Sequence, residues 1–214
     1  MTLRLPGSTH SSRKDATRRA LLEAALNVFG EKGYHATAVD EIVNRAGRSK
    51  GAAYFHFPSK EAIFRALVRE LAGHLAGKIE RAIDEAESPA DRLDTALLAL
   101  IDVFVRHRIL ARLVLLEVAG AGRAFSEDLI FVRCQFADLI GRELDAGVAA
   151  GVIAPCDTGL IATAWFGALN EVVVHWLHDP EAGSLHARYP TIRQLLLQSV
   201  GLHPSMVTGV PAHA

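Results

Sequence analysis

The chain contains 214 residues, half of them hydrophobic, and carries a formal net charge of −1 at pH 7. This length suits one large domain or two small ones, and the apolar fraction is enough for a substantial core. The near-neutral charge excludes a chain that is basic throughout. Two isolated cysteines, Cys134 and Cys156, exclude a disulfide framework, and we expect them to be small buried residues rather than redox-sensing thiols.

Targeting and membrane signals are weak in this sequence. The N-terminal residues lack the apolar core of a secretory signal peptide. The most apolar stretch, 160–177, is interrupted by Asn170, Glu171 and His175, which argues against a membrane span. These features predict a soluble cytoplasmic protein without a membrane partner.

Charge is distributed unevenly along the chain. Residues 1–60 hold ten Lys and Arg against five Asp and Glu, a balance of +5, whereas residues 61–214 hold thirteen against nineteen, a balance of −6. This asymmetry indicates one part that faces a polyanion and one part with another task. The alternative is a chance excess of solvated charge in the first part.

The predicted elements begin after a polar, basic stretch, 1–14, which we expect to be a mobile arm. A helix is predicted from residue 16, and Gly33 is placed to end it in the left-handed conformation. One face of this helix carries apolar residues at helical spacing: Leu21, Ala25, Val28 and Phe29.

Two short helices follow within the next 25 or so residues. Thr37 and Asp40 have the spacing of a capping box, although Asp is the weaker partner, and Gly47 ends that helix after about two turns. Ser49 is placed to cap a third helix and Ser59 a fourth. Three helices in about forty residues, the last two joined by a glycine-containing turn, form a helix-turn-helix pattern.

The rest of the chain also has helical periodicity, which predicts an all-α fold. The expected helical spans are 60–86, 91–118, 126–150, 157–177 and 188–201. The segment 203–214 is predicted to be a disordered tail.

The third helix has an unusual composition, with small residues, rings and cations in one short segment, 47–60. At 100° per residue, Ala53 and Phe57 lie within about 40° of each other and can pack inward. Most of the remaining surface points away from the core and offers hydrogen-bond donors from Lys50, Tyr54 and His56. A duplex has the phosphates and the wide groove that such a helix fits. The alternative, an ordinary core helix, does not explain outward-facing rings beside lysines.

These residues carry a resemblance to a known family. The stretch TRRALLEAALNVFGEKGYHATAVDEIVNRAGRSKGAAYFHFPSKEAIF, residues 17–64, resembles the N-terminal domain of TetR/AcrR transcriptional regulators. The matching positions include Ala25, Phe29, Gly33-Tyr34, Thr37, Ile42, Ala46-Gly47, Ser49, Gly51, Tyr54, Phe57 and Ser59-Lys60-Glu61. The C-terminal part matches nothing as sharply.

The resemblance implies a homodimer that binds palindromic double-stranded operator DNA. It implies a helix-turn-helix domain at 15–60 and a helical ligand-binding and dimerisation domain at 61–202. Thr37, Tyr54 and Lys60 then correspond to phosphate contacts. Groove-facing positions are Ser49, Lys50, Gly51, Ala52, Phe55 and His56.

Two positions depart from the family pattern. Val43 stands where Ala is usual, and the core has to accommodate the added bulk. Arg48 stands where a small apolar residue is usual. We hypothesise a phosphate or base contact for Arg48, and the alternative is a solvent-exposed arginine in a turn.

The C-terminal part is expected to supply the dimer contact through its last two helices and, by resemblance, an effector pocket. A fatty acyl group or a drug-like aromatic would fit an apolar pocket with a few polar anchors. Ordinary core is the favoured interpretation of any one candidate taken alone, whereas the set as a whole suggests an apolar cavity with a few polar anchors. The candidate lining residues are Phe104, His107, Leu116, Phe131, Gln135, Trp165, Phe166, Leu169, Asn170 and Trp176. Candidates for the anionic end of a ligand such as an acyl-CoA are Arg108, Arg112, Arg123 and Arg133.

Three classes of function stay open at this point. A ligand-released repressor is favoured over a DNA-binding regulator without inducer, and both over an enzyme on a helical fold. The sequence has no GxSxG, Walker or HExxH motif. His175 and His178 alone are a weak metal signal, so we expect neither metal nor cofactor.

Overall fold

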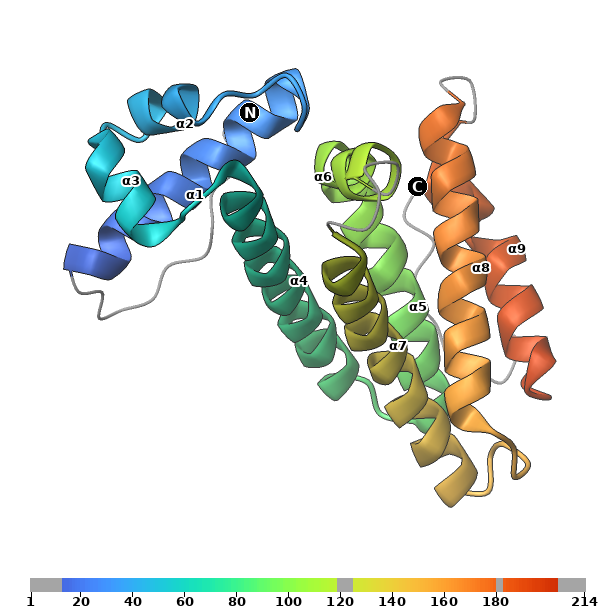
Figure 1. Ribbon diagram of the computed structural model, residues 1–214. Helices are drawn as coiled ribbons and strands as arrows, with labels where there is room; N and C mark the ends of the chain where they lie inside the picture. The colour runs from blue at the N-terminus through green and yellow to red at the C-terminus, as the bar shows by residue number, and fades with distance from the viewer. Residues whose placement is uncertain (1–12, 119–124, 180–182, 204–214) are drawn as a thin grey trace. The chain divides into compact units, whose positions relative to one another are not determined.

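The computed structural model of the chain describes residues 13–118, 125–179 and 183–203 (Figure 1). Every regular element in these ranges is a helix, which confirms the predicted all-α class. Most of the predicted arm and all but His203 of the predicted tail lie outside the described residues. Arg13 and Lys14, assigned to the arm, already belong to the first helix.

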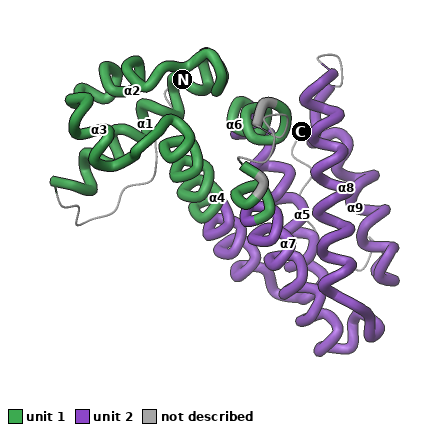
Figure 2. The backbone as a smooth tube through the Cα atoms, viewed as in Figure 1, with its two compact units in different colours: residues 1–74, 109–130 green, residues 75–108, 131–214 purple. Residues whose placement is uncertain are grey.

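The chain forms two compact units (Figure 2). Unit 1 comprises residues 1–74 and 109–130, and unit 2 comprises residues 75–108 and 131–214. Unit 1 therefore extends beyond the predicted DNA-binding domain and includes a segment from much later in the sequence.

Unit 1 is built from α1 (Arg13–Lys32), α2 (Val39–Arg45), α3 (Lys50–His56) and the first part of α4 (Lys60–Asp84). Gly33 ends α1 with φ of +82° and Gly47 ends α2 with φ of +60°, conformations that suit glycine because it has no Cβ. The predicted inner face of α1 is buried.

The predicted caps are correct at two of three helix starts. Ser49 Oγ accepts from the Ala52 N–H at 3.2 Å, and Ser59 Oγ accepts from the Ala62 N–H at 3.1 Å. The prediction that Thr37 caps α2 is wrong, because α2 begins one residue later, after Ala38. The Thr37 hydroxyl donates instead to the Gly33 carbonyl at 2.7 Å, which satisfies a carbonyl at the end of α1.

An aromatic cluster forms the centre of unit 1. Phe29, Tyr34 and Phe64 pack with ring centroids 5.0–5.6 Å apart. Phe125 packs at 5.2 Å against both Tyr34 and Phe64 and is buried. Phe125, the residue just before α7 (Ser126–Ala149), thus completes the core of unit 1.

The segment that enters unit 1 is also fixed by charge. Asp128, in the first turn of α7, is buried, and its carboxylate pairs with Arg69 at 2.6 Å and Arg65 at 3.2 Å, both on α4. A buried carboxylate requires such partners because its desolvation is costly.

The long span predicted at 91–118 is not one helix. It divides into α5 (Pro89–Arg106), α6 (Arg108–Arg112) and a π-helix, η1 (Leu113–Val118). His107, with φ of −114° and ψ of 36°, leaves the helical region and separates α5 from α6. No glycine or proline marks this break, so the sequence gives no local signal for it.

Unit 2 comprises the end of α4 with α5, all but the first five residues of α7 (Ser126–Ala149), α8 (Thr158–His178) and α9 (Leu185–Ser199), whose long axes run alongside one another (Figure 1). The predicted start of the last helix at 188 is three residues late, because α9 begins at Leu185, a full turn before Pro190. Asp157 Oδ1 caps α8 by accepting from the Leu160 N–H at 2.9 Å.

A buried polar cluster joins α5 to α9 in unit 2. Asp94, which is buried, accepts from the Arg193 Nε at 2.6 Å and from the Tyr189 hydroxyl at 2.5 Å. Burial, followed by the nearby Asp94 carboxylate, raises the pKa of Tyr189 above its usual value, so this hydroxyl stays a donor. A second ion pair, Arg92 with Glu143 at 2.6 Å, joins α5 to α7.

Helix α8, which contains the apolar stretch 160–177, is long and apolar enough to span a membrane by length and composition alone, despite its polar interruptions. Core helices of soluble proteins meet the same criterion, and α8 has a buried face that includes Trp165, Leu169 and Val173. The expectation of buried cysteines is wrong, because Cys134 on α7 and Cys156 before α8 are both exposed.

Candidate nucleic-acid interface and effector site

Helix α3 presents a mixed surface of small, aromatic and cationic side chains. The predicted inward pair, Ala53 and Phe57, is buried at 1% and 5% exposure, which confirms the helical-wheel assignment. Tyr54 and Phe55 are exposed at 44% and 72%. Other exposed or partly exposed residues of this surface are Ser49, Lys50, Gly51, Ala52 and His56.

Lys50, the long side chain of this surface, has an acidic partner that the sequence does not predict. Its Nζ lies 2.8 Å and 3.1 Å from the two carboxylate oxygens of Asp40 on α2. The hydrogen bond to Asp40 raises the pKa of Lys50, so the ammonium stays charged. Only the helix-turn-helix geometry brings the two residues together, so local sequence patterns could not reveal the pair.

Arg48 is exposed in the turn between α2 and α3. Its backbone N–H donates to the Val43 carbonyl at 3.2 Å, which fixes the turn. Among the described residues, the structure shows no partner for the Arg48 guanidinium. A contact between Arg48 and DNA therefore stays a prediction, and a solvent-exposed arginine in the turn stays its alternative.

Thr37 and Lys60 are engaged within unit 1. Thr37 is 3% exposed, so a phosphate contact by its hydroxyl would require that group to become accessible. Lys60 Nζ donates to the carbonyls of Tyr34 at 2.9 Å, His35 at 3.2 Å and Thr37 at 2.9 Å. These three bonds use the whole donor capacity of an ammonium group. Lys60 therefore holds the α1–α2 turn against the start of α4.

We expect Lys60→Met to lower the free energy of unfolding by about 2 kcal/mol, because hydrogen bonds to a charged group contribute about 1.5–3 kcal/mol. The 34–37 turn should also lose protection in hydrogen-exchange mass spectrometry. Lys78→Met is the matched control, since Lys78 is exposed on the same helix. Equal unfolding midpoints for the two variants would contradict the assigned role of Lys60.

Two cations of α1 flank the α3 surface. Lys14 Nζ lies 5.4 Å from the centre of the exposed Phe55 ring, and Arg18 lies 5.6 Å from that of Phe57. Arg18 also pairs with Glu70 at 2.6 Å. Positive charge from α1 is thus added beside the predicted recognition helix, as the basic N-terminal stretch suggested.

Four of the predicted effector residues form the buried face of α8. Trp165, Phe166, Leu169 and Trp176 are 1–5% exposed. Trp165 Nε1 donates to Ser199 Oγ and Trp176 Nε1 to the Gly183 carbonyl, both at 3.0 Å. The indole groups are therefore satisfied within unit 2.

The other predicted effector residues are dispersed. Phe104 and His107 lie partly exposed at the end of α5, Asn170 is partly exposed on α8, and Phe131 is exposed on α7. Leu116 belongs to unit 1. Among the arginines, Arg108 stacks 4.3 Å from the Trp176 ring, Arg112 and Arg133 are exposed, and Arg123 lies outside the described residues.

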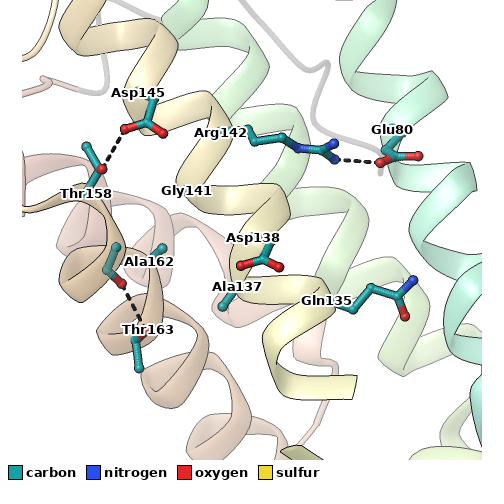
Figure 3. Close-up of a pocket in the computed structure, with 11 residues that line it drawn as sticks. Glu80, Gln135, Ala137, Asp138, Gly141, Arg142, Asp145, Thr158, Ala162 and Thr163 are labelled. Atoms are coloured by element: carbon teal, nitrogen blue, oxygen red, sulfur yellow. Dashed lines mark hydrogen bonds and ion pairs between the residues drawn. The ribbon is translucent and has the colours of Figure 1, made fainter. Parts of the chain in front are cut away.

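A described pocket of unit 2 has a volume of 570 Å³ and lies among α7, the start of α8 and the end of α4 (Figure 3). Of the ten predicted effector residues, only Gln135 lines this pocket. Its lining is polar: Arg142 pairs with Glu80 at 2.5 Å, and Thr158 donates to Asp145 at 2.6 Å (Figure 3). This pocket differs from the apolar one expected from the sequence, so the effector residues stay a prediction.

Comparison with known proteins assigns both parts of the chain. The family model described as "Bacterial regulatory proteins, tetR family" matches residues 21–67. The model described as "Tetracyclin repressor-like, C-terminal domain" matches residues 86–186. Together these matches include the short helices of unit 1 and most of the helices of unit 2.

Full-length relatives support the assignment. The fatty acid metabolism regulator protein of Bacillus subtilis is 24% identical over 181 residues, covering 84% of this chain and 93% of its own. The fatty acid degradation regulator FadR of Bacillus halodurans is 26% identical, with a TM-score of 0.78 over 91% of this chain and all of its own.

A third similarity concerns the fold. The B. subtilis FadR structure with stearoyl-CoA has a TM-score of 0.75 at 24% identity, over 85% of this chain and 97% of its own. The helix-turn-helix geometry, the matched ranges of both parts and the near-complete coverage of these relatives lead to one assignment. This chain is a transcriptional regulator that belongs to the TetR family.

Proposed function

We propose that this protein is a cytoplasmic repressor that binds a palindromic operator as a homodimer. A largely apolar effector releases it from the operator, and a fatty acyl-CoA is the first candidate for that effector. The observation that carries the DNA-binding part is the α3 surface, where Tyr54 and Phe55 stay exposed while Ala53 and Phe57 anchor the helix. Two adjacent exposed rings form a contiguous apolar surface, which is typical of a site that a partner covers.

The acyl-CoA candidate rests on relatives. The named functions of the B. subtilis and B. halodurans proteins concern fatty acids, and one of the solved structures contains stearoyl-CoA. The apolar α8, with its aromatic face, is compatible with a chain-like ligand once unit 2 adjusts. Release then follows if the effector binds more tightly to an arrangement in which the two α3 helices no longer match the operator half-sites.

Operator binding is tested first. Duplexes selected from a random library by the purified protein should converge on a palindrome whose half-site centres are about one helical turn apart or a multiple of it. Fluorescence anisotropy should then give a Kd at least about a thousandfold tighter than for a scrambled duplex. Failure to select any sequence would remove the proposal.

Effector specificity is tested on the selected operator. Stearoyl-CoA should release the protein, whereas free CoA and a detergent of equal chain length should not. No release by any acyl-CoA, with operator binding intact, would favour a regulator without a small-molecule inducer or with an effector of another class. These outcomes separate the DNA-binding proposal from the effector proposal.

The dimer contact is proposed at α8 and α9. Leu160 on α8 and Leu195 on α9 are each 66% exposed, a high value for leucines on well-ordered helices. Two copies related by a two-fold axis would bury these side chains in a four-helix contact, and a symmetric dimer matches a palindrome.

We expect the double change Leu160→Glu and Leu195→Glu to convert a dimer into a monomer in sedimentation velocity. Each change would place a charge in the interface at a cost of about 2–5 kcal/mol. Val152→Glu is the matched control, because Val152 is 42% exposed in the segment between α7 and α8. An unchanged dimer in the double variant would place the interface elsewhere.

A further inference from the structure

The ion pair between Asp40 and Lys50 lies on the predicted DNA-facing side of unit 1. Asp40 is in the first turn of α2, and Lys50 is the first residue of α3. Lys50 Nζ lies within 3.1 Å of both Asp40 carboxylate oxygens. An acidic side chain beside a recognition lysine is unexpected at a surface that has to approach phosphates, because it repels them.

Stability does not explain the pair. Both side chains are about three-fifths exposed, at 61% for Lys50 and 62% for Asp40. Exposed ion pairs contribute little to folding, since water screens the charges and two flexible side chains lose entropy. A second explanation is that an acidic residue suits the positive end of a helix. Glu41 occupies the same turn and already supplies that charge.

We propose that Asp40 is a specificity-determining residue of the DNA-binding surface, which positions the Lys50 ammonium for the guanine acceptors of one base pair and keeps it from phosphates. This inference rests on the proposed function, because it requires Lys50 to face the groove. A lysine has a compact charge on a flexible stem and takes any phosphate oxygen within reach. A carboxylate that holds two of its donors leaves one to point outward at a base edge.

The consequence is a trade of affinity against selectivity. With Asp40 present, the DNA-binding surface of each subunit carries one less effective positive charge, so binding to unrelated DNA is weak. Without its carboxylate, Lys50 would bind the backbone, and binding to all duplexes would strengthen while the preference at one base pair would fall.

The test compares Asp40→Asn with the wild-type protein on three kinds of duplex: the selected operator, its single base-pair substitutions and a scrambled sequence. The base pair read by Lys50 is located first, as the position where Lys50→Ala relaxes discrimination. For the wild-type protein, the Kd for the substituted duplex should exceed the Kd for the operator by about tenfold or more at that position, as expected for a good contact. Asp40→Asn should reduce this ratio at least about threefold.

Salt dependence supplies a readout that a purely structural role would not change. For Asp40→Asn on the scrambled duplex, the slope of log Kobs against log salt concentration should steepen by about 0.9 for each subunit whose Lys50 gains a phosphate contact. In the double variant Asp40→Asn with Lys50→Ala, both effects should disappear, because the lysine on which Asp40 acts is gone.

Glu41→Gln is the matched control. Glu41 lies in the same turn and carries the same charge, but it pairs with Lys32 at 2.6 Å instead of Lys50. If Asp40 acts through Lys50, Glu41→Gln should leave the discrimination at the Lys50 base pair unchanged. Asp40→Ser serves as a second variant that suits a helix start, and thermal unfolding by circular dichroism verifies that all variants fold.

Each remaining outcome overturns the inference for a separate reason. Equal effects of Asp40→Asn and Glu41→Gln would assign the effect to charge at the helix end. Unchanged discrimination and salt slope in Asp40→Asn would remove the positioning role. A uniform loss across all duplexes in Lys50→Ala would make Lys50 a phosphate contact while operator binding stands. Failure of the wild-type protein to select any duplex would overturn the proposed function together with the inference.

Discussion

Phe125→Ala is expected to lower the free energy of unfolding of unit 1 by about 3–5 kcal/mol, the usual cost of removing a buried phenylalanine ring. Phe125 is 3% exposed and contacts both Tyr34 and Phe64, so its loss leaves a cavity in the middle of the aromatic cluster. Urea denaturation followed by far-ultraviolet circular dichroism measures the change. Operator affinity should fall with it, since the cluster supports the turn that Lys60 holds.

Phe131→Ala is the control for this prediction. Phe131 lies six residues later on α7 and is 41% exposed, so its removal leaves no comparable cavity and should change stability by less than about 1 kcal/mol. Equal destabilisation by the two substitutions would mean that burial of Phe125 in the aromatic cluster is not the cause of the loss.

Asp94→Ala is expected to cost about 3–5 kcal/mol, the range found when one partner of a buried ion pair is removed. The substitution leaves the guanidinium of Arg193, whose side chain is 19% exposed, and the Tyr189 hydroxyl without the carboxylate that both contact. Fluorescence of Trp165 and Trp176, both in unit 2, reports the unfolding midpoint. Because the cluster joins α5 to α9, we also expect a weaker dimer.

Asp102→Ala is the control, since Asp102 is on the same helix and also pairs with two groups, Arg106 at 2.9 Å and His186 at 2.5 Å. Its side chain is 31% exposed and its partners are more exposed, so the loss should be about 0–1 kcal/mol. If Asp102→Ala were as harmful as Asp94→Ala, burial would not be the reason for the effect.

Local features of unit 1 could be predicted because they depend on neighbours in the sequence. Ser49 and Ser59 cap helices that begin at the next residue, and Gly33 ends α1 by its own backbone conformation. The burial of Ala53 and Phe57 follows from a spacing of four residues on one helix. Each of these depends on a few consecutive residues, which periodicity and capping rules describe well.

Features that depend on distant residues could not be predicted in the same way. Asp40 and Lys50 meet across a turn, Lys60 reaches carbonyls more than twenty residues earlier, and Phe125 joins a cluster formed by residues before 65. The break at His107 has no composition signal, since a single residue outside helical geometry leaves the apolar pattern intact. Periodicity reports which face is apolar and says nothing about which partner covers it.

The lining of an effector site is also hard to predict from periodicity, because it too depends on distant residues. Trp165, Phe166 and Trp176 are rings on an apolar helix, and such rings suit a close-packed core as well as an effector pocket. Gln135, one of the polar candidates, lies at the described pocket, and its Oε1 atom is buried and accepts no hydrogen bond among the described residues. The other two polar candidates, His107 and Asn170, do not line this pocket.

The discontinuity of unit 1 has a consequence for protein engineering. A chimaera that joins residues 1–60 of this chain to the effector part of a relative would omit Phe64 and Phe125, two of the rings that pack against Tyr34 in the core of unit 1. The transplanted residues would then depend on whatever rings the recipient supplies at those positions. Exchange of DNA specificity between such regulators should therefore succeed when α3 and its neighbour Asp40 are grafted alone, and fail when the cut is made at residue 60.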